Sequence, residues 1–187
     1  MDIKSNLRWP GGKSKMIKNI SPFLPKQIDK YYELFSGGAS IGINIMQHYS
    51  NMSEIYLNDI DVDLCNYYCV ITNELSRKSF IEKTLIIKNN YNAESFKNKF
   101  EELKNSIFCD NIMNAVKFFV VNKCGFSGLK MSSYSRQAFE RNFTINSILK
   151  IEDIGKLFFR NNVIIENNDF QNSKIIDKSG FFVYIDP

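Results

Sequence analysis

The feature that most constrains this chain is residues 31–44, where a short apolar segment runs through two glycines into a helical pattern. The pattern predicts a buried strand, a turn at Gly37 and Gly38, and a helix that begins at Ala39 or Ser40. A strand followed by a glycine turn and a helix N-terminus presents backbone N–H groups and the positive end of a helix dipole to a ligand. We therefore expect an α/β fold in which this turn forms part of a ligand site.

An acidic residue stands beside this turn. Glu33 occupies the carboxyl end of the expected strand, the edge at which open α/β sheets bind ligands. A phosphate-binding loop would carry Lys and then Ser or Thr after its glycines, and the G-x-G-x-x-G spacing of a dinucleotide site is also absent. The acid instead favours a ligand that is cationic or rich in hydroxyl groups, although a Gly-Gly pair alone is most often only a tight turn.

A second acid follows the next expected strand, residues 54–57. Asp59 lies about twenty residues beyond the glycine turn, the offset at which nucleotide-binding βαβ units place an acid on ribose hydroxyls. Asp61 fits the N-cap of the helix that follows. Both aspartates could be helix caps, and we prefer the ligand-binding interpretation for Asp59 alone.

Composition is that of a soluble globular protein. The 187 residues are enough for one domain with a real core, and no apolar run reaches transmembrane length. The N-terminus lacks the features of a signal peptide, so we expect a cytoplasmic protein without a membrane partner. The four cysteines show no C-x-x-C spacing and His48 is the only histidine, which argues against a zinc site, disulfides and histidine-based catalysis. We expect four buried free thiols and no metal.

Positive charge is concentrated in residues 113–150. This segment holds six Lys or Arg residues against the single acid Glu140, a net charge of +5 in a chain whose total is +4. The aromatic residues Tyr134, Phe139 and Phe143 are interleaved with these charges, a pattern that suits phosphate contact and base stacking on a polyanion. An ordinary surface loop whose aromatic side chains pack back on the body would have the same composition.

The N-terminal segment 7–13 contains a Pro-Gly-Gly turn before a helical pattern. Lys13 opens that helix, where a cation opposes the helix dipole. Its position therefore suggests that a ligand or a carboxylate partner binds its ammonium group. Trp9, the only tryptophan, could equally be an anchor of the core.

The rest of the chain continues an alternation of helices and strands. Residues from about 74 to 119 have a helical pattern. Its buried stripe is expected at Phe96, Phe100, Leu103 and Ile107. A helix at 146–159 and strands at 162–166 and 180–185 follow, and the last strand is apolar enough for the centre of a parallel sheet.

Taken in order, these motifs resemble those of the Dam-type DNA adenine methyltransferases, the alpha group in which a target-recognition insert separates the cofactor half from the catalytic motif. The resemblance spans the whole chain and rests on six short segments. They are WPGGK at Trp9–Lys13, ELFSGG at Glu33–Gly38, LNDID at Leu57–Asp61, NKCGFSGL at Asn122–Leu129, NNDF at Asn167–Phe170 and VYIDP at Val183–Pro187. Single motifs of this kind are common, and six in the family's order are a strong signal.

The resemblance implies a fold and a division of the chain. The fold would be a Rossmann-like S-adenosylmethionine-dependent methyltransferase sheet, incomplete at its C-terminal side, with a mostly helical target-recognition insert. Residues 1–62 and 160–187 would form the cofactor-binding and catalytic α/β domain. Residues 63–159 would form a helical region that contains the insert at about 113–150. The partner would be double-stranded DNA and the cofactor S-adenosylmethionine, without a metal.

The resemblance also implies roles for individual residues. Those expected to bind the cofactor are Trp9, Lys13, Glu33, Phe35, Gly37, Gly38, Asp59, Asp169 and Phe170. The segment NKCGFSGL implies contact with DNA for Asn122, Lys123, Phe126 and Ser127. Lys130, Arg136 and Arg141 are further candidates because of their positive charge, not because of the resemblance, since the chain differs from familiar members of the family around residues 132–142. Asp186 and Pro187 match the start of the catalytic D-P-P-Y and would accept hydrogen bonds from the adenine amine, which localises its lone pair toward the sulfonium methyl. The target base would be flipped out of the duplex.

The end of the sequence departs from the family pattern. The second Pro and the Tyr of D-P-P-Y are absent, as are the further strands of the fold, so the strand at 180–185 would form an unpaired apolar edge. We expect these 187 residues alone to bind cofactor weakly without turnover, and a second chain or a missing C-terminal half to complete the fold. Two other functions stay open: a non-catalytic DNA-binding remnant, and an amino-methyltransferase that acts on cytosine or RNA.

Overall fold

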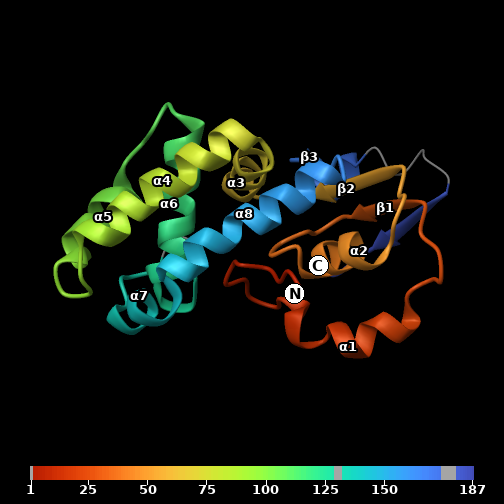
Figure 1. Cartoon of the computed structure of the whole chain (residues 1–187), viewed down its shortest axis with the longest axis horizontal. Helices are drawn as coiled ribbons and strands as arrows, with labels where there is room; N and C mark the ends of the chain where they lie inside the picture. The colour runs from red at the N-terminus through yellow and green to blue at the C-terminus, as the bar shows by residue number, and fades with distance from the viewer. Residues whose placement is uncertain (1, 129–131, 174–179) are drawn as a thin grey trace.

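The computed structural model describes residues 2–128, 132–173 and 180–187 (Figure 1). The strands in these ranges form one parallel sheet in the order β3–β2–β1–β4. They are β1 (Lys30–Glu33), β2 (Glu54–Asn58), β3 (Ile164–Glu166) and β4 (Phe181–Tyr184). The expected α/β fold with a parallel sheet is confirmed, and β4 lies at one edge of the sheet.

The strand order explains which face the helices cover. The chain passes from β1 to β2 through α2 (Ser40–His48), and from β2 to β3 through a longer helical excursion. The helices of this excursion are α3 (Val62–Thr72), α4 (Glu74–Asn90), α5 (Phe96–Asn105), α6 (Asn111–Cys124), α7 (Arg136–Asn142) and α8 (Ile145–Arg160). Both connections step across the sheet in the same direction, so right-handed crossovers place them on the same face. The packing of α2 against α8 agrees with this arrangement.

Short elements complete the chain. They are η1 (Lys13–Lys15), α1 (Ile17–Ile20), η2 (Ser21–Phe23), η3 (Phe126–Gly128) and η4 (Phe170–Asn172). Figure 1 shows the sheet with α1 and α2 at one end of the molecule and α5 and α7 at the other, with α8 running between them. Helix α8 thereby connects the two ends of the molecule.

One buried apolar cluster extends from the sheet into the helices. It includes Tyr31, Ile55 and Leu57 on the strands, and Tyr67 and Phe119 on α3 and α6. The last two rings lie nearly parallel, with centroids 6.0 Å apart. Burial of a large apolar side chain stabilises the fold by roughly 1.5–3 kcal/mol. The sheet and the helical excursion are therefore stabilised by a common core.

Side-chain caps divide the segment 74–119, which the sequence predicts as helical. Asn73 caps the N-terminus of α4 and Asp110 caps that of α6. Between them, α5 ends at Asn105, and Ile107 is 96 % exposed. The prediction that Ile107 continues the buried stripe is therefore wrong, because the helix that would carry it ends two residues earlier.

Tyr134, Phe139 and Phe143, the aromatic residues interleaved with the positive charges of the basic segment 113–150, pack on the core. Phe139 and Phe143 are buried, and the ammonium group of Lys88 lies 3.8 Å from the centroid of the Phe139 ring. The hydroxyl of the half-buried Tyr134 donates to a backbone carbonyl at 2.6 Å. Of the two interpretations that the sequence left open, the structure supports the one in which these rings pack back on the body, and it contradicts base stacking by them.

The cysteines differ in their exposure. Cys65 and Cys124 are buried free thiols, whereas Cys69 and Cys109 are exposed, so the prediction of four buried thiols holds for the first pair only. Within the described ranges, no helix has both the length and the apolar character needed to cross a membrane. The same ranges contain no group of three His, Cys, Asp or Glu side chains arranged to hold a metal ion.

Candidate active site

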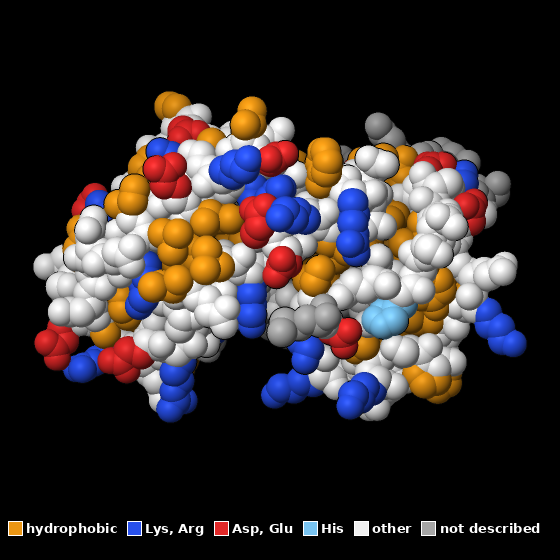
Figure 2. Space-filling view, in the orientation of Figure 1, with side chains coloured by type: hydrophobic (Ala, Val, Ile, Leu, Met, Phe, Trp, Pro, Cys, Tyr) orange, Lys and Arg blue, Asp and Glu red, His pale blue; other side chains and the backbone are white. Residues whose placement is uncertain are grey.

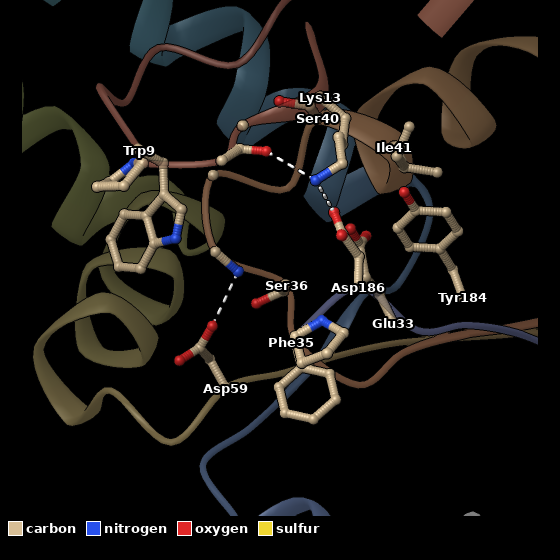
Figure 3. Close-up of a pocket in the computed structure, with 16 residues that line it drawn as sticks. Trp9, Lys13, Glu33, Phe35, Ser36, Ser40, Ile41, Asp59, Tyr184 and Asp186 are labelled. Atoms are coloured by element: carbon tan, nitrogen blue, oxygen red, sulfur yellow. Dashed lines mark hydrogen bonds and ion pairs between the residues drawn. The ribbon is translucent and has the colours of Figure 1, made fainter. Parts of the chain in front are cut away.

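A cleft of about 240 Å³ lies at the carboxyl ends of β1, β2 and β4 (Figure 3). It is lined by Trp9, Pro10, Gly11, Gly12, Lys13, Glu33, Phe35, Ser36, Gly37, Gly38, Ser40, Ile41, Asp59, Tyr184, Asp186 and Pro187. The chain leaves β1 toward β2 on one side, while β4 lies on the other side of β1. The cleft therefore stands at the switch point of the sheet, where open α/β folds bind ligands.

Close packing holds the glycine turn after β1 in shape. Gly37 has a φ of 43°, in the left-handed region that glycine adopts without strain. A Cβ atom on Gly37 would lie 2.5 Å from Nε1 of Trp9, so the indole ring rests directly on the turn. Tyr68 holds the same residue by donating its hydroxyl proton to the Gly37 carbonyl at 2.6 Å. The helix α2 begins at Ser40, as the sequence predicts.

Asp59 binds two backbone N–H groups with its two carboxylate oxygens. Oδ2 accepts from Gly37 at 2.8 Å, and Oδ1 accepts from Asp61 at 3.0 Å. Asp61 in turn caps α3 by accepting from the N–H groups of Asp63 and Leu64, which confirms its predicted role. Asp59 thus fixes the turn and lines the cleft, where its oxygens keep lone pairs for hydroxyl donors.

Glu33 is a buried acid, with 3 % of its surface exposed. Its Oε2 accepts from the Tyr31 hydroxyl at 3.0 Å and from the Gly42 N–H at 3.0 Å. Burial raises the pKa of Glu33 to about 8; these two hydrogen bonds oppose the shift, and the carboxylates of Asp186 and Asp59 add to it. The carboxyl group is therefore mostly protonated at neutral pH, and a cation in the cleft would favour its ionised form.

Lys13 and Asp186 form an ion pair that joins the N-terminal segment to the end of β4. The Lys13 Nζ lies 2.5 Å from Asp186 Oδ2 and donates to the Gly11 carbonyl at 2.9 Å (Figure 3). Asp186 is thus the carboxylate partner that the position of Lys13 suggests. Among the described lining residues, Lys13 carries the one ammonium group, whereas Asp59 and Asp186 carry carboxylates and Glu33 can ionise, so the cleft favours a ligand with positive charge.

Tyr184 and Asn58 also contribute to the site, and neither is among the residues that the sequence predicts there. Tyr184 lines the cleft, and burial, with Asp186 and Glu33 nearby, raises its pKa to about 12. Strand alternation is the sequence signal for Tyr184, because residues two apart on a strand face the same side, and Tyr184 stands two residues before the predicted site residue Asp186. Asn58 is buried, and its Nδ2 donates at 3.0 and 3.1 Å to carbonyls in the turns after β1 and β3.

Asp169 and Phe170 lie next to the cleft but are not among its described lining residues. Asp169 caps η4 by accepting from the Gln171 N–H at 2.9 Å. Phe170 is 47 % exposed, and its ring centroid lies 5.4 Å from that of Phe35, which does line the cleft. The structure thus places this pair on the turn that adjoins the expected cofactor site.

Two residues expected to contact DNA are instead buried. Asn122 and Lys123 are 2 % and 5 % exposed and form hydrogen bonds with Arg8 and Asn6 of the N-terminal segment. Burial, with the neighbouring charge of Arg8, lowers the pKa of Lys123 to about 7. Their burial contradicts direct contact with DNA, because neither side chain offers a surface to a phosphate.

Phe126, Ser127, Arg136 and Arg141, which are also expected to contact DNA, lie at the surface. Phe126 is 68 % exposed and, with Ser127 and Arg141, lines a hollow between η3 and α7. Arg136 forms ion pairs with two carboxylates, each at 3.1 Å. Lys130 lies outside the described residues. The hollow therefore presents three of the expected DNA-contacting residues together.

The fold and the cleft are those of a ligand-binding α/β protein. A parallel sheet with a glycine turn at its switch point and acids at the ends of β1 and β2 is consistent with the fold of S-adenosylmethionine-dependent methyltransferases. The chain belongs to the family of D12 class N6 adenine-specific DNA methyltransferases, whose model matches residues 9–187. This match confirms the family resemblance that the sequence motifs indicate.

Several relatives share this similarity. The chain is 28% identical over 211 residues to the type II methyltransferase M.MjaIII of Methanocaldococcus jannaschii, a match that covers 100% of this chain and 69% of the relative. It is 36% identical over 83 residues to the type II methyltransferase M.FokI of Planomicrobium okeanokoites, which covers 44% of this chain and 11% of that protein. It is 26% identical over 123 residues to a DNA adenine methylase of Vibrio cholerae, which covers 66% of this chain and 42% of that protein. The chain therefore spans about two thirds of the first relative and less than half of the other two.

Proposed function

We propose that this chain forms the cofactor-binding and target-recognition parts of a site-specific DNA methyltransferase, which moves a methyl group from S-adenosylmethionine to the exocyclic amine of adenine in double-stranded DNA. The observation that carries the proposal is the cleft in which Glu33, Asp59 and the Lys13–Asp186 ion pair converge. The description of the matching family supports adenine as the target base.

The donor groups of the cleft fit S-adenosylmethionine. Asp59 offers carboxylate oxygens to ribose hydroxyls, and Glu33 offers a buried carboxyl group to a cationic group of the ligand. Trp9 and Phe35 supply aromatic surfaces, which favour a cation, and Gly37 leaves its backbone accessible. When bound, the cofactor supplies a methyl group that its positive sulfonium activates.

Asp186 is the residue proposed to act on the target base. The adenine amine is a weak nucleophile because its lone pair is delocalised into the ring. A carboxylate that accepts a hydrogen bond from this amine localises the lone pair and stabilises the positive charge that develops on the nitrogen. Lys13 orients the Asp186 carboxylate through the ion pair, and the carbonyl of Pro187 is the proposed second acceptor. A base inside a duplex must leave the stack to reach these groups.

The DNA-binding surface is proposed at the hollow between η3 and α7. Phe126 offers an exposed ring for stacking, and Arg141 offers a guanidinium group to a phosphate or a base edge. Figure 2 shows a notch along the edge of the molecule between α7 and α1, with Lys and Arg side chains projecting on both sides. Positive charge on both sides of a notch suits the phosphates of a duplex.

Binding and methyl transfer test the proposal together. The chain is titrated with S-adenosylmethionine in a calorimeter and then incubated with the cofactor and unmethylated genomic DNA. The DNA is digested to nucleosides and analysed by mass spectrometry. We expect weak cofactor binding by the chain alone, and N6-methyladenine as the product once a polypeptide that supplies the rest of the D-P-P-Y motif and the further strands of the fold is added. Absence of cofactor binding, or methylcytosine as the product, would contradict the proposal. A parallel incubation with RNA tests the alternative that the protein methylates RNA.

A further inference from the structure

The end of α6 carries a buried side chain that the proposed mechanism does not use. The Asn122 Oδ1 accepts from the Arg8 N–H at 2.9 Å, and its Nδ2 donates to the Arg8 carbonyl at 2.8 Å. The same Nδ2 lies 3.2 Å from the Gly128 carbonyl, to which it also donates. This arrangement, the Asn122–Arg8 clasp, joins the N-terminal segment, α6 and η3 through one side chain.

The Arg8 side chain strengthens the clasp. Its Nη1 donates to the carbonyls of Gly125 at 2.6 Å, Lys123 at 3.3 Å and Asn122 at 3.4 Å. These carbonyls belong to the last turn of α6 and the residue after it, where unsatisfied carbonyl groups and the helix dipole favour a cation. Lys123 also donates to Oδ1 of Asn6 at 2.8 Å. The N-terminal segment is therefore held to α6 at two of its residues.

The turn η3 lies directly on the clasp. Gly128 has a φ of 75°, and a Cβ atom there would lie 2.7 Å from the Arg8 carbonyl oxygen. Phe126 and Ser127, the exposed candidates for DNA contact, belong to the same turn. The turn that presents them is therefore in close contact with the Arg8 backbone.

The cleft lies at the other end of this connection. Trp9 follows Arg8 directly, rests on Gly37 and lines the cleft. Lys13, four residues further along, holds Asp186. The clasp and the cleft thus share one short stretch of backbone, which is fixed by contacts on both sides.

We propose that Asn122 is a positioning residue that couples the cofactor cleft to the recognition turn η3 through the backbone of Arg8. A ligand packed against Trp9 favours the arrangement of η3 that binds DNA, and bound DNA favours the arrangement of the cleft that binds the ligand. The coupling is reciprocal, because each ligand must change the affinity for the other by the same factor. The inference rests on the function proposed above.

The test measures a coupling factor, defined as the Kd for S-adenosylmethionine without DNA divided by the Kd with saturating duplex DNA. Trp9 is the only tryptophan, so its fluorescence reports each titration from inside the cleft. We expect a factor of about 5 or more for the unaltered chain and a factor close to 1 for N122A. The matched control is N114A, because Asn114 lies on the same helix and its amide donates instead to the Phe108 carbonyl at 2.8 Å. This control should keep the factor of the unaltered chain.

A second variant covers the case in which N122A does not fold. N122D keeps the side-chain volume and the acceptor for the Arg8 N–H, and it removes both donated hydrogen bonds. A merely structural role would lower the melting temperature and leave the coupling factor unchanged. The inference is overturned if the folded Asn122 variant keeps the factor, if N114A loses it equally, or if the unaltered chain binds the two ligands independently. Failure of the unaltered chain to bind S-adenosylmethionine would refute the proposed function, and the inference with it.

Discussion

The cleft and the end of α6 both bury polar groups, and they satisfy them in different ways. In the cleft, Glu33 accepts its hydrogen bonds on one oxygen and has other carboxylates for neighbours. At the end of α6, Asn122 uses both ends of its amide, and Lys123 donates to the N-terminal segment. A buried group with bonding capacity left can receive a ligand, whereas a fully bonded one fixes a geometry.

The pKa shifts of Glu33 in the cleft and Lys123 at the end of α6 differ in the same way. Burial raises the pKa of the Glu33 acid and lowers that of the Lys123 base, so both groups shift toward their neutral forms. In the cleft, a cationic ligand can reverse this shift, because it would pair with the ionised carboxylate. At the end of α6, the neutral amine of Lys123 can keep its hydrogen bond to Asn6 without a counter-charge, so this contact needs no ligand. The comparison therefore assigns ligand binding to one region and positioning to the other.

The largest expected effect is on methyl transfer. Asp186→Asn keeps the volume of the side chain and removes the carboxylate that Lys13 orients. Loss of one preorganised group at a reacting centre lowers the rate by about 10²–10³. In the reaction completed by the added polypeptide, we expect the transfer rate to fall by about this factor, while the Kd for S-adenosylmethionine stays near that of the unaltered chain. A proportionate loss of cofactor binding would contradict the assignment of Asp186 to the target base.

A smaller effect is expected on the pH dependence of stability. The pKa of Glu33 is about 8 in the folded chain and 4.5 ordinarily, so between these values the folded state keeps a proton that the unfolded state has lost. The free energy of unfolding therefore falls as pH rises from about 5 to about 8, by up to about 1.4 kcal/mol per pH unit. Glu33→Gln should remove this fall in urea unfolding curves. The same fall in the variant would show that another group causes it.

Lys123 should produce a slope of the opposite sign. Its pKa is about 7 in the folded chain against 10.5 ordinarily, so the unfolded state binds the extra proton between these values. Its contribution makes the free energy of unfolding rise with pH above about 7, again by at most about 1.4 kcal/mol per unit. The difference between unfolding curves of the unaltered chain and Lys123→Met isolates this contribution. Lys18→Met, at an exposed lysine, is the control and should leave the pH dependence unchanged.

The smallest expected effect distinguishes two arginines of the basic segment. Arg141 lines the hollow beside Phe126, whereas Arg136 is ion-paired with two carboxylates. Arg141→Ala should make the negative slope of log K against log salt concentration shallower by about one, the contribution of one phosphate contact. Arg136→Ala should leave the slope unchanged. Fluorescence anisotropy of a labelled duplex measures both, and equal slopes for the two variants would contradict the proposed DNA surface.

Local sequence pattern predicted the framework of the cleft. The strand, the glycine turn and the helix at Ser40 follow from short-range conformational preferences, as does the cap at Asp61. Because parallel strands end at the same edge of a sheet, acids placed after three different strands come together there. Glu33, Asp59 and Asp186 meet for this reason, although they are far apart in sequence.

The sequence did not predict the burial or the partners of residues that contact segments far away in the chain. Asn122 and Lys123 have the composition of a polar surface, and the partners that bury them lie 114 and 117 residues away. Asp186 as the partner of Lys13 is equally invisible to local patterns, even though the position of Lys13 indicated that a partner exists. Helix ends limited the prediction as well, because the exposure of Ile107 depends on where α5 stops.

The central claim is that the buried carboxyl group of Glu33 makes the cleft a site for a cationic cofactor. Calorimetric titration with S-adenosylmethionine from about pH 6 to about pH 9 tests it directly, and the ratio of Kd values for the unaltered chain and Glu33→Gln cancels the titration of the ligand itself. Because Glu33 ionises near pH 8, we expect the unaltered chain to gain affinity relative to the variant as pH rises toward that value. The gain should approach about tenfold per pH unit. A ratio that does not change with pH would contradict the claim.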